Sequence, residues 1–126
     1  MNSEATTAAE IRAAFDSYEA ALMANDVDAL SGFFWRDPRA VRLSAGGGLY
    51  GFDEIAAFRK GRNVSDIERD LTRVEILVLA PDLGVANTEY RRRNSELNGA
   101  QSQVWKRFAE GWRIVSAHVS LAAKRA

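Results

Sequence analysis

The spacing of apolar residues changes once along this chain of 126 residues, near Ser65. Before that point apolar side chains recur every three or four residues, which predicts helices, and after it they alternate, which predicts strands. Helices followed by an uninterrupted series of strands are typical of an α+β domain, in which the helices cover one face of a mainly antiparallel sheet. We therefore expect a single α+β domain over residues 1–126, and a parallel βαβ topology is disfavoured.

The helical half predicts two helices before the first proline. Thr7 and Glu10 have the spacing of a capping box, in which two side chains help to satisfy the free N–H groups at the start of a helix. This first helix is long and amphipathic, and it is expected to end near Asn25. A shorter helical run follows and ends before Asp37-Pro38, because the residue before a proline avoids the helical conformation.

The middle of the chain predicts a small hairpin over residues 40–50, with its turn at Gly46-Gly47-Gly48. Asp53 is expected to be the N-cap of a third helix that runs to about Arg62. The alternating second half predicts four successive antiparallel strands joined by turns. The expected strands are residues 67–80, 84–94, 101–108 and 112–122, and the expected turns between them lie at residues 81–84, at Asn98-Gly99 and at Glu110-Gly111.

Composition excludes several classes of function. The 17 Lys and Arg residues balance the 17 Asp and Glu residues, which removes the usual electrostatic basis for binding nucleic acid or an anionic membrane and leaves small neutral or acidic ligands. The absence of cysteine rules out a disulfide, a thiolate nucleophile and a sulfur-ligated metal, and a single histidine disfavours a transition-metal site. No signal peptide or long apolar stretch is recognisable, so we expect a cytoplasmic protein without cofactor or metal.

Several short segments resemble one known family, and together they span most of the chain, from about Tyr18 to Leu121. The most specific are residues 34–39 (FWRDPR), 55–62 (IAAFRKGR) and 111–120 (GWRIVSAHVS). They look like the AtzH-like family, also called oxalurate-catabolism proteins, within the NTF2-like and SnoaL-like superfamily of cone folds. This resemblance implies three N-terminal helices and a small hairpin packed on a curved, mainly antiparallel sheet.

The same resemblance implies a function in the breakdown of small ureido and amide carboxylates. The family includes a decarboxylating amidohydrolase that acts on carboxylated urea or biuret compounds. We therefore expect a metal-independent amidohydrolase that cleaves a C–N bond of such an acid, with or without loss of carbon dioxide. The alternative is a non-catalytic, ligand-binding or assembly homodimer of the same fold. A homodimer is expected in either case, because Tyr90, Trp105 and Trp112 on the strands exceed what a small monomer readily buries.

Tyr18 and Arg42 are the predicted catalytic pair. Tyr18 lies on the apolar face of the first helix, where a phenol can donate a hydrogen bond to developing negative charge or a proton to a leaving nitrogen. Arg42 lies between two apolar residues on a short strand, and its guanidinium matches a planar carboxylate. The structural alternatives are a core tyrosine bonded to a backbone carbonyl and a solvated surface arginine. The resemblance to the family favours the functional roles.

Four further residues are candidates for binding the substrate: Arg59, Glu89, Gln103 and His118. Glu89 is a candidate base toward water, Gln103 a partner for an amide, and Arg59 a cation at the entrance. His118, the only histidine, is a secondary candidate. Each also has a purely structural interpretation, such as a cross-strand ion pair, a solvated helix face or a satisfied histidine. The strand assignments assume a regular alternation, which one β-bulge would invert.

Overall fold

The first helix, α1 (Glu4–Met23), begins three residues before the predicted capping box. In the computed structural model, which describes residues 3–122, Ser3 is the N-cap and its side chain accepts a hydrogen bond from the backbone N–H of Thr6. Thr7 is buried within the helix, and its hydroxyl donates to the carbonyl oxygen of Pro81 at 3.3 Å. The predicted cap at Thr7 is therefore wrong, and Thr7 instead fastens α1 to the turn that follows the first long strand.

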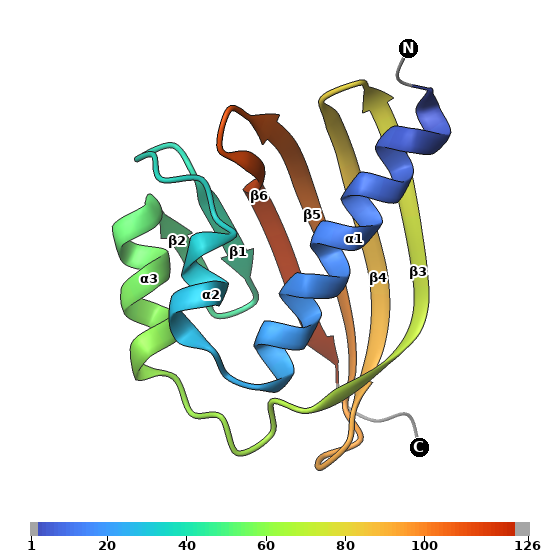
Figure 1. Cartoon of the computed structure of the whole chain (residues 1–126). Helices are drawn as coiled ribbons and strands as arrows, with labels where there is room; N and C mark the ends of the chain where they lie inside the picture. Colours follow the sequence, from blue (N-terminus) through green and yellow to red (C-terminus); the bar gives the residue numbers. More distant parts are fainter. Residues whose placement is uncertain (1–2, 123–126) are drawn as a thin grey trace.

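Of the two shorter helices, α2 (Val27–Gly32) lies beside α1, and α3 (Phe52–Gly61) lies beside α2 (Figure 1). Helix α2 is capped by Asp26, whose carboxylate accepts from the N–H of Ala29. Helix α3 follows Gly51, whose φ of 91° lies in the region that favours glycine. The predicted N-cap at Asp53 is wrong by two residues, because Gly51 is the N-cap and the helix already begins at Phe52.

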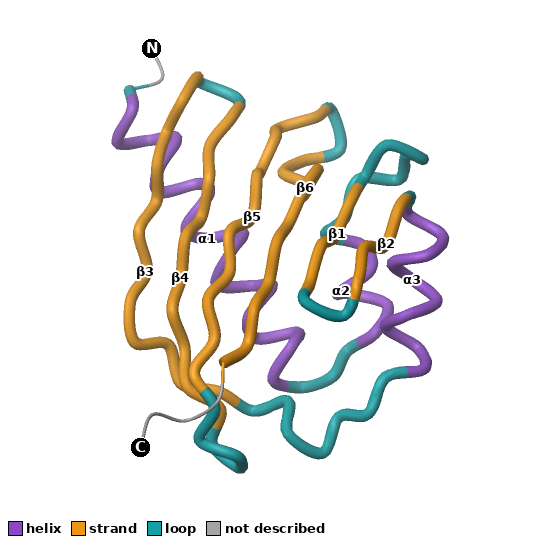
Figure 2. Tube along the Cα trace, turned by 180° about the vertical axis from the view of Figure 1, so that it is seen from behind, coloured by secondary structure: helices purple, strands orange, loops and turns teal. Residues whose placement is uncertain are grey.

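Six strands form one sheet in the order β2-β1-β6-β5-β4-β3. Neighbouring strands are antiparallel except β1 and β6, which run parallel, so the N-terminal hairpin joins the sheet beside the last strand of the chain (Figure 2). The predicted α+β fold, with helices and a small hairpin on a mainly antiparallel sheet, is confirmed. The strands are β1 (Val41–Ser44), β2 (Gly47–Tyr50), β3 (Arg69–Ala80), β4 (Leu83–Arg92), β5 (Asn98–Phe108) and β6 (Gly111–Ala122).

The predicted turn at Asn98-Gly99 is wrong, because both residues belong to β5 and the connection between β4 and β5 is residues 93–97. A glycine is needed at position 99 because of the neighbouring residue on β4. A Cβ atom at this position would collide with the ring of Tyr90, which lies over the glycine from the neighbouring strand. Gly99 therefore makes room for an aromatic ring on the helix-covered face of the sheet.

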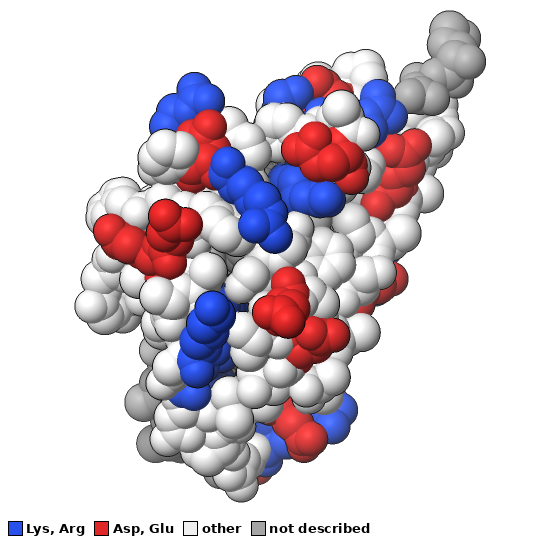
Figure 3. Space-filling model, turned by 60° about the vertical axis from the view of Figure 1, so that its left-hand side comes forward, with Lys and Arg blue, Asp and Glu red and all other residues white. Residues whose placement is uncertain are grey.

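Charged side chains of both signs are mixed on the face shown in Figure 3. Many form surface ion pairs, such as Arg12 with Asp16 at 3.0 Å and Arg39 with Asp37 at 2.9 Å. In these surface pairs the positive and negative charges offset each other. Within residues 3–122, no helix is long and apolar enough to cross a membrane.

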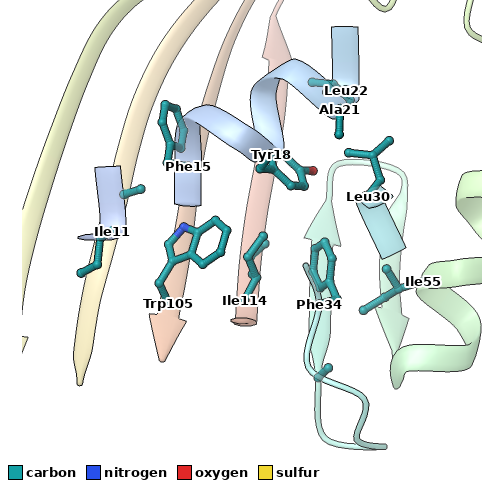
Figure 4. Close-up of a cluster of buried hydrophobic side chains, with 13 residues drawn as sticks. Ile11, Phe15, Tyr18, Ala21, Leu22, Leu30, Phe34, Ile55, Trp105 and Ile114 are labelled. Carbon is teal, nitrogen blue, oxygen red and sulfur yellow. The ribbon is translucent and has the colours of Figure 1, made fainter. Parts of the chain in front are cut away.

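The core lies between the helices and the sheet (Figure 4). Phe15 from α1, Phe34 and Trp105 are at most 1 % exposed, and Tyr90 is 2 % exposed. Trp112 is half-buried and its indole N–H donates to Glu10 at 2.9 Å. The aromatic residues that suggested a dimer interface are thus internal, and that argument for a homodimer does not stand.

The other face of the sheet carries no helix (Figure 2). One row of outward-facing residues crosses five strands in register and is almost wholly apolar. We call it the outer apolar row, and it consists of Leu77, Val85, Val104, Ser116 and Val41. Leu77 is 51 % exposed, so the row is open to solvent at its β3 end.

Candidate functional site

A cavity of about 40 Å³ lies between α1, α3 and the helix-covered face of the sheet. It is large enough for a few water molecules. Guanidinium groups dominate its lining and come from five positions on four segments of the chain: β1, the end of α3, β3 and β4. We call these five residues the arginine cluster: Arg42, Arg59, Arg62, Arg69 and Arg92. Tyr18, Tyr90 and Gln101 supply the other polar side chains of the lining.

Arg59 and Tyr18 meet inside this cavity. Tyr18 is 3 % exposed and Arg59 only 1 %, and Nη2 of Arg59 donates to the phenolic oxygen at 2.5 Å. The guanidinium carbon also lies 5.5 Å from the centres of the Tyr18 and Phe34 rings. Nε and Nη1 of Arg59 have no hydrogen-bond partner among residues 3–122. A buried cation without an opposite charge is costly, so this group calls for an anion.

Arg69, by contrast, is fully paired. Its guanidinium grips Glu19 through two hydrogen bonds, from Nε at 3.1 Å and from Nη2 at 2.5 Å. The same Nη2 donates to Oε1 of Gln101 at 3.2 Å, and the group lies 4.0 Å over the ring of Tyr90. Burial alone lowers the pKa of Arg69, but the bonds to Glu19 outweigh it and raise the pKa above its ordinary value. Glu19 is thereby committed to Arg69 and does not neutralise the rest of the cluster.

Arg42 and Arg62 complete the unpaired part of the cluster. Arg42 lies 4.8 Å over the ring of Phe58, and Nε and Nη2 of Arg62 have no partner. Burial, and then the charge of Arg59, lower the pKa of Arg42 and bring that of Arg62 down to about 10. Within residues 3–122 neither of them, nor Arg59, forms an ion pair. Three like charges are therefore held together with no carboxylate between them.

The phenol of Tyr18 responds to these charges. Burial raises the pKa of a phenol, but the guanidinium groups of Arg59, Arg69 and Arg42 outweigh burial here and lower the pKa of Tyr18 below its ordinary value. The lowered pKa makes Tyr18 a better proton donor than a free tyrosine and makes its phenolate more accessible.

The structure brings Tyr18, Arg42 and Arg59 together in the lining of one cavity. It does not place Arg59 at a solvated entrance, because α3 turns this side chain into the interior. Arg62, the C-cap residue that follows α3, also lines this cavity. Ile55, four residues before Arg59, is the sequence signal that Arg59 belongs to the inward face of the helix.

Glu89 and His118 lie elsewhere, which corrects their predicted place in the chamber. Both are exposed on the helix-free face, where Glu89 is in register with Ala100, and His118 with Ser102. Their chain neighbours Tyr90 and Ala117 are the buried ones, so the alternation of side chains turns Glu89 and His118 away from the cavity.

Gln103 is buried but does not line the cavity. Its Oε1 accepts a hydrogen bond from the indole N–H of Trp105 at 3.2 Å, which makes it part of the core. Gln101, two residues earlier on the same face, takes the place in the cavity that was predicted for Gln103. The two glutamines cannot be distinguished by strand parity, which explains the error.

The donor set of the cavity suits an anion. Guanidinium groups donate hydrogen bonds and accept none, so they cannot ligate a cation. Within the described part of the chain, residues 3–122, no three His, Asp or Glu side chains gather as metal ligands would. The arrangement can donate several charge-assisted hydrogen bonds to an anion beside the phenol of Tyr18.

Comparison with known proteins supports the same fold. A family model described as AtzH-like matches residues 2–125. A solved structure of a protein of unknown function from Pectobacterium atrosepticum is 45 % identical, with a TM-score of 0.90, and the match covers 95 % of this chain and 94 % of that one. No curated protein matches the sequence.

Two further solved structures extend this likeness. A cystatin-like fold protein from Burkholderia xenovorans is 35 % identical with a TM-score of 0.89, covering 97 % of this chain and 96 % of that one. A nuclear transport factor 2 (NTF2-like) superfamily protein from Salmonella enterica is 25 % identical with a TM-score of 0.77, covering 98 % and 96 % of the two chains. The helices and sheet described above are thus those of the NTF2-like superfamily.

Proposed function

The chain belongs to the AtzH-like family, and on this premise we propose that it is an amidohydrolase that cleaves a C–N bond of a small ureido or amide carboxylate. One observation carries the proposal: Arg42, Arg59 and Arg62 surround a buried phenol without a carboxylate of the protein to neutralise them. Such an arrangement fits a ligand that brings its own negative charge.

Binding of the acid rests on the unpaired arginines. Nε and Nη1 of Arg59, and Nε and Nη2 of Arg62, are free to donate to carboxylate oxygens. Arg42 approaches from the opposite element, β1, and its stacking on Phe58 limits its movement. Charge-assisted hydrogen bonds from planar guanidinium groups select planar anions, which describes ureido and amide carboxylates.

Tyr18 supplies proton transfer at the bound acid. In its phenolate form, which the lowered pKa favours, it takes a proton from water as the oxygen of that water attacks the carbonyl carbon. The C–N bond then breaks, and the phenol returns the proton to the departing nitrogen. One water is consumed, and the products are an amine or ammonia and a carboxylic acid. Where that acid is a carbamic acid, it loses carbon dioxide.

A second candidate is a binding protein without turnover. The carboxylates that touch the cluster are already paired, Glu19 with Arg69 and Asp66 with Arg92 at 3.6 Å. His118, the only histidine, lies on the other face of the sheet. Among residues 3–122 the cavity therefore offers no free carboxylate or imidazole as base, which favours ligand binding alone if Tyr18 does not act as the base.

We also propose that the protein is a homodimer, with a second copy of this chain covering the helix-free face of the sheet. The support is the outer apolar row, in which Leu77, Val85 and Val104 lie side by side. On the same face Arg73 pairs with Glu75 at 3.2 Å, so these two charges offset each other. A twofold axis through the sheet would place one apolar row against the other.

The test is an assay of the purified protein with carboxylated urea and carboxylated biuret, following ammonia and carbon dioxide. We expect Tyr18→Phe and Arg42→Ala each to lower kcat/KM by about a hundredfold or more, since each removes a group that acts on the reacting atoms. His118→Ala, on the other face, is the matched control and should leave the rate unchanged. Absence of turnover, or turnover indifferent to both cavity variants, would refute the enzyme proposal.

A further inference from the structure

The carboxamide of Gln101 has a defined orientation in the cavity. Nη2 of Arg69 donates to it at 3.2 Å, and a guanidinium can only donate, so the atom facing Arg69 must be the oxygen Oε1. Arg69 is itself held by two hydrogen bonds to Glu19 and by the Tyr90 ring beneath it. The amide nitrogen Nε2 of Gln101 therefore has to point away from Arg69.

That nitrogen is a buried donor without a partner. Gln101 is 7 % exposed, its side chain lines the cavity, and Nε2 is fully buried with no hydrogen-bond acceptor in the described part of the chain, residues 3–122. The hydroxyl of Thr88, in register with Gln101 on β4, is turned to the carbonyl of Arg73 instead. Leaving a buried N–H unpaired costs about 1–3 kcal/mol, so the group fits a site that a ligand completes.

The donor also differs in kind from the others in the cavity. Arg42, Arg59 and Arg62 are charged and suit carboxylate oxygens, whereas an amide N–H is neutral and suits a neutral acceptor. A ureido or amide acid carries both kinds of oxygen in one plane, the carboxylate and the carbonyl of the C–N bond. The two types of donor in the cavity correspond to these two types of oxygen.

We propose that Gln101 is a specificity-determining residue whose Nε2 donates to the carbonyl oxygen of the bound acid, and that the Glu19–Arg69 pair is the positioning element that aims it. This inference rests on the proposed anion site. It extends that site to ligands with a carbonyl group close to the carboxylate. Simple aliphatic carboxylates of the same length lack the acceptor and leave Nε2 unpaired.

The experiment is calorimetric titration of the full chain with malonamate and with butyrate. The two monoanions have chains of equal length, and only malonamate has an amide carbonyl near its carboxylate. We expect the wild type to bind malonamate roughly tenfold or more tightly than butyrate, the effect of one buried hydrogen bond. This comparison needs no variant, so it stands even where a substitution impairs folding. A wild type that binds neither acid, or binds both equally, overturns the proposal.

Two variants test whether Gln101 causes the preference for malonamate over butyrate. Gln101→Met keeps the length of the side chain and removes the donor, and it should abolish the preference while leaving butyrate affinity within about twofold. Gln103→Met is the matched control, a buried glutamine on the same strand and face that does not line the cavity, and it should keep the preference. Equal weakening of both acids in Gln101→Met would indicate a merely structural role and overturn the proposal.

The positioning pair is tested by Glu19→Gln, which releases Arg69. We expect the malonamate-to-butyrate affinity ratio to fall while butyrate binding is not weakened, since the variant adds net positive charge to the cavity. A ratio that stays at the wild-type value overturns the positioning role. These measurements need no turnover. A malonamate preference that depends on Gln101 therefore supports the inference even if the protein cleaves no ureido acid. Absence of cleavage would refute only the enzyme proposal.

Discussion

At the scale of single residues, Arg59 combines near-complete burial with two N–H positions that have no partner in the protein. Its one strong contact is with the phenol of Tyr18, an uncharged group. In the unliganded protein this arrangement destabilises the fold, because desolvation of the cation is only partly offset. On the proposed function, binding of a small acid relieves that cost, so affinity for the ligand and stability of the free protein are opposed at this site.

The opposition predicts the behaviour of the double variant Tyr18→Phe/Arg59→Met. Replacing both members of a buried polar pair by apolar groups of similar size removes the uncompensated charge without leaving an orphaned partner. We expect the free energy of unfolding, measured by urea denaturation at neutral pH without added carboxylates, to rise by about 1–4 kcal/mol. Binding of malonamate should be lost. A variant less stable than the wild type would show that Arg59 is compensated within the protein.

The lowered pKa of Tyr18 predicts a pH dependence of stability. The folded state releases the phenol proton at a lower pH than the unfolded state, whose tyrosines titrate near pH 10. Between these two values the unfolded chain binds more protons, so stability from Tyr18 grows as pH rises and is lost as pH falls through the folded pKa. The difference in unfolding free energy between wild type and Tyr18→Phe should therefore increase toward pH 10. Tyr50 and Tyr90 are present in both proteins, so their titration cancels in this comparison. A difference in unfolding free energy that stays constant with pH would contradict the lowered pKa of Tyr18.

At the scale of secondary-structure elements, the close contact between β4 and β5 supports the site. Gly99 on β5 leaves space for the ring of Tyr90 on β4, and that ring lies 4.0 Å beneath the guanidinium of Arg69. Arg69 in turn holds the carboxamide of Gln101. Gly99 thus determines, through the ring of Tyr90, how far the guanidinium of Arg69 lies above the sheet.

Gly99→Ala tests this contact. The added Cβ meets the Tyr90 ring, so the ring or the strand must shift, and we expect a loss of about 1–3 kcal/mol in thermal or urea unfolding. Gly61→Ala at the end of α3 is the control, because nothing lies within 4 Å of a Cβ built there. An effect of Gly99→Ala no larger than that of Gly61→Ala would show that the ring adapts freely.

The sequence predicts the helices and strands well, but it predicts the directions of their side chains correctly only at some positions. The change of apolar spacing near Ser65 separates helices from strands correctly, since burial of one face imposes those spacings on each type of element. Ser3 and Thr7 are both good caps by residue type, and only the packing of Thr7 against Pro81 decides between them. Arg69, Gln101 and Glu19 gave no comparable signal, because a network of polar side chains from three elements exists only after the elements have packed.

At the scale of the whole molecule, the two faces of the sheet differ in their use. One is covered by helices and encloses the arginine cluster, and the other is open and carries the outer apolar row together with Glu89 and His118. The prediction that Glu89 and His118 lie in the cavity is wrong for this reason. An alternating strand pattern shows which residues share a face, but it does not show which face the helices cover.

The proposed homodimer predicts that Leu77→Glu shifts the protein toward monomer in sedimentation-velocity runs. Leu77 is 51 % exposed in the single chain, so a charge there should affect stability little and the interface strongly. Val64→Glu, in the segment between α3 and β3, replaces another exposed apolar residue away from the row and should not alter the sedimentation coefficient. A wild type that sediments as a monomer at all concentrations refutes the dimer.

The parallel pairing of β1 with β6 has a consequence for the order in which the protein can be completed. The hairpin that carries Arg42 is made early, yet it is joined to the main sheet only through the last strand of the chain. A ribosome-bound polypeptide that still lacks β6 already contains Tyr18 and Arg59 but has no edge to hold Arg42 beside them. A product truncated before β6 would thus lack the Arg42 side of the proposed anion site.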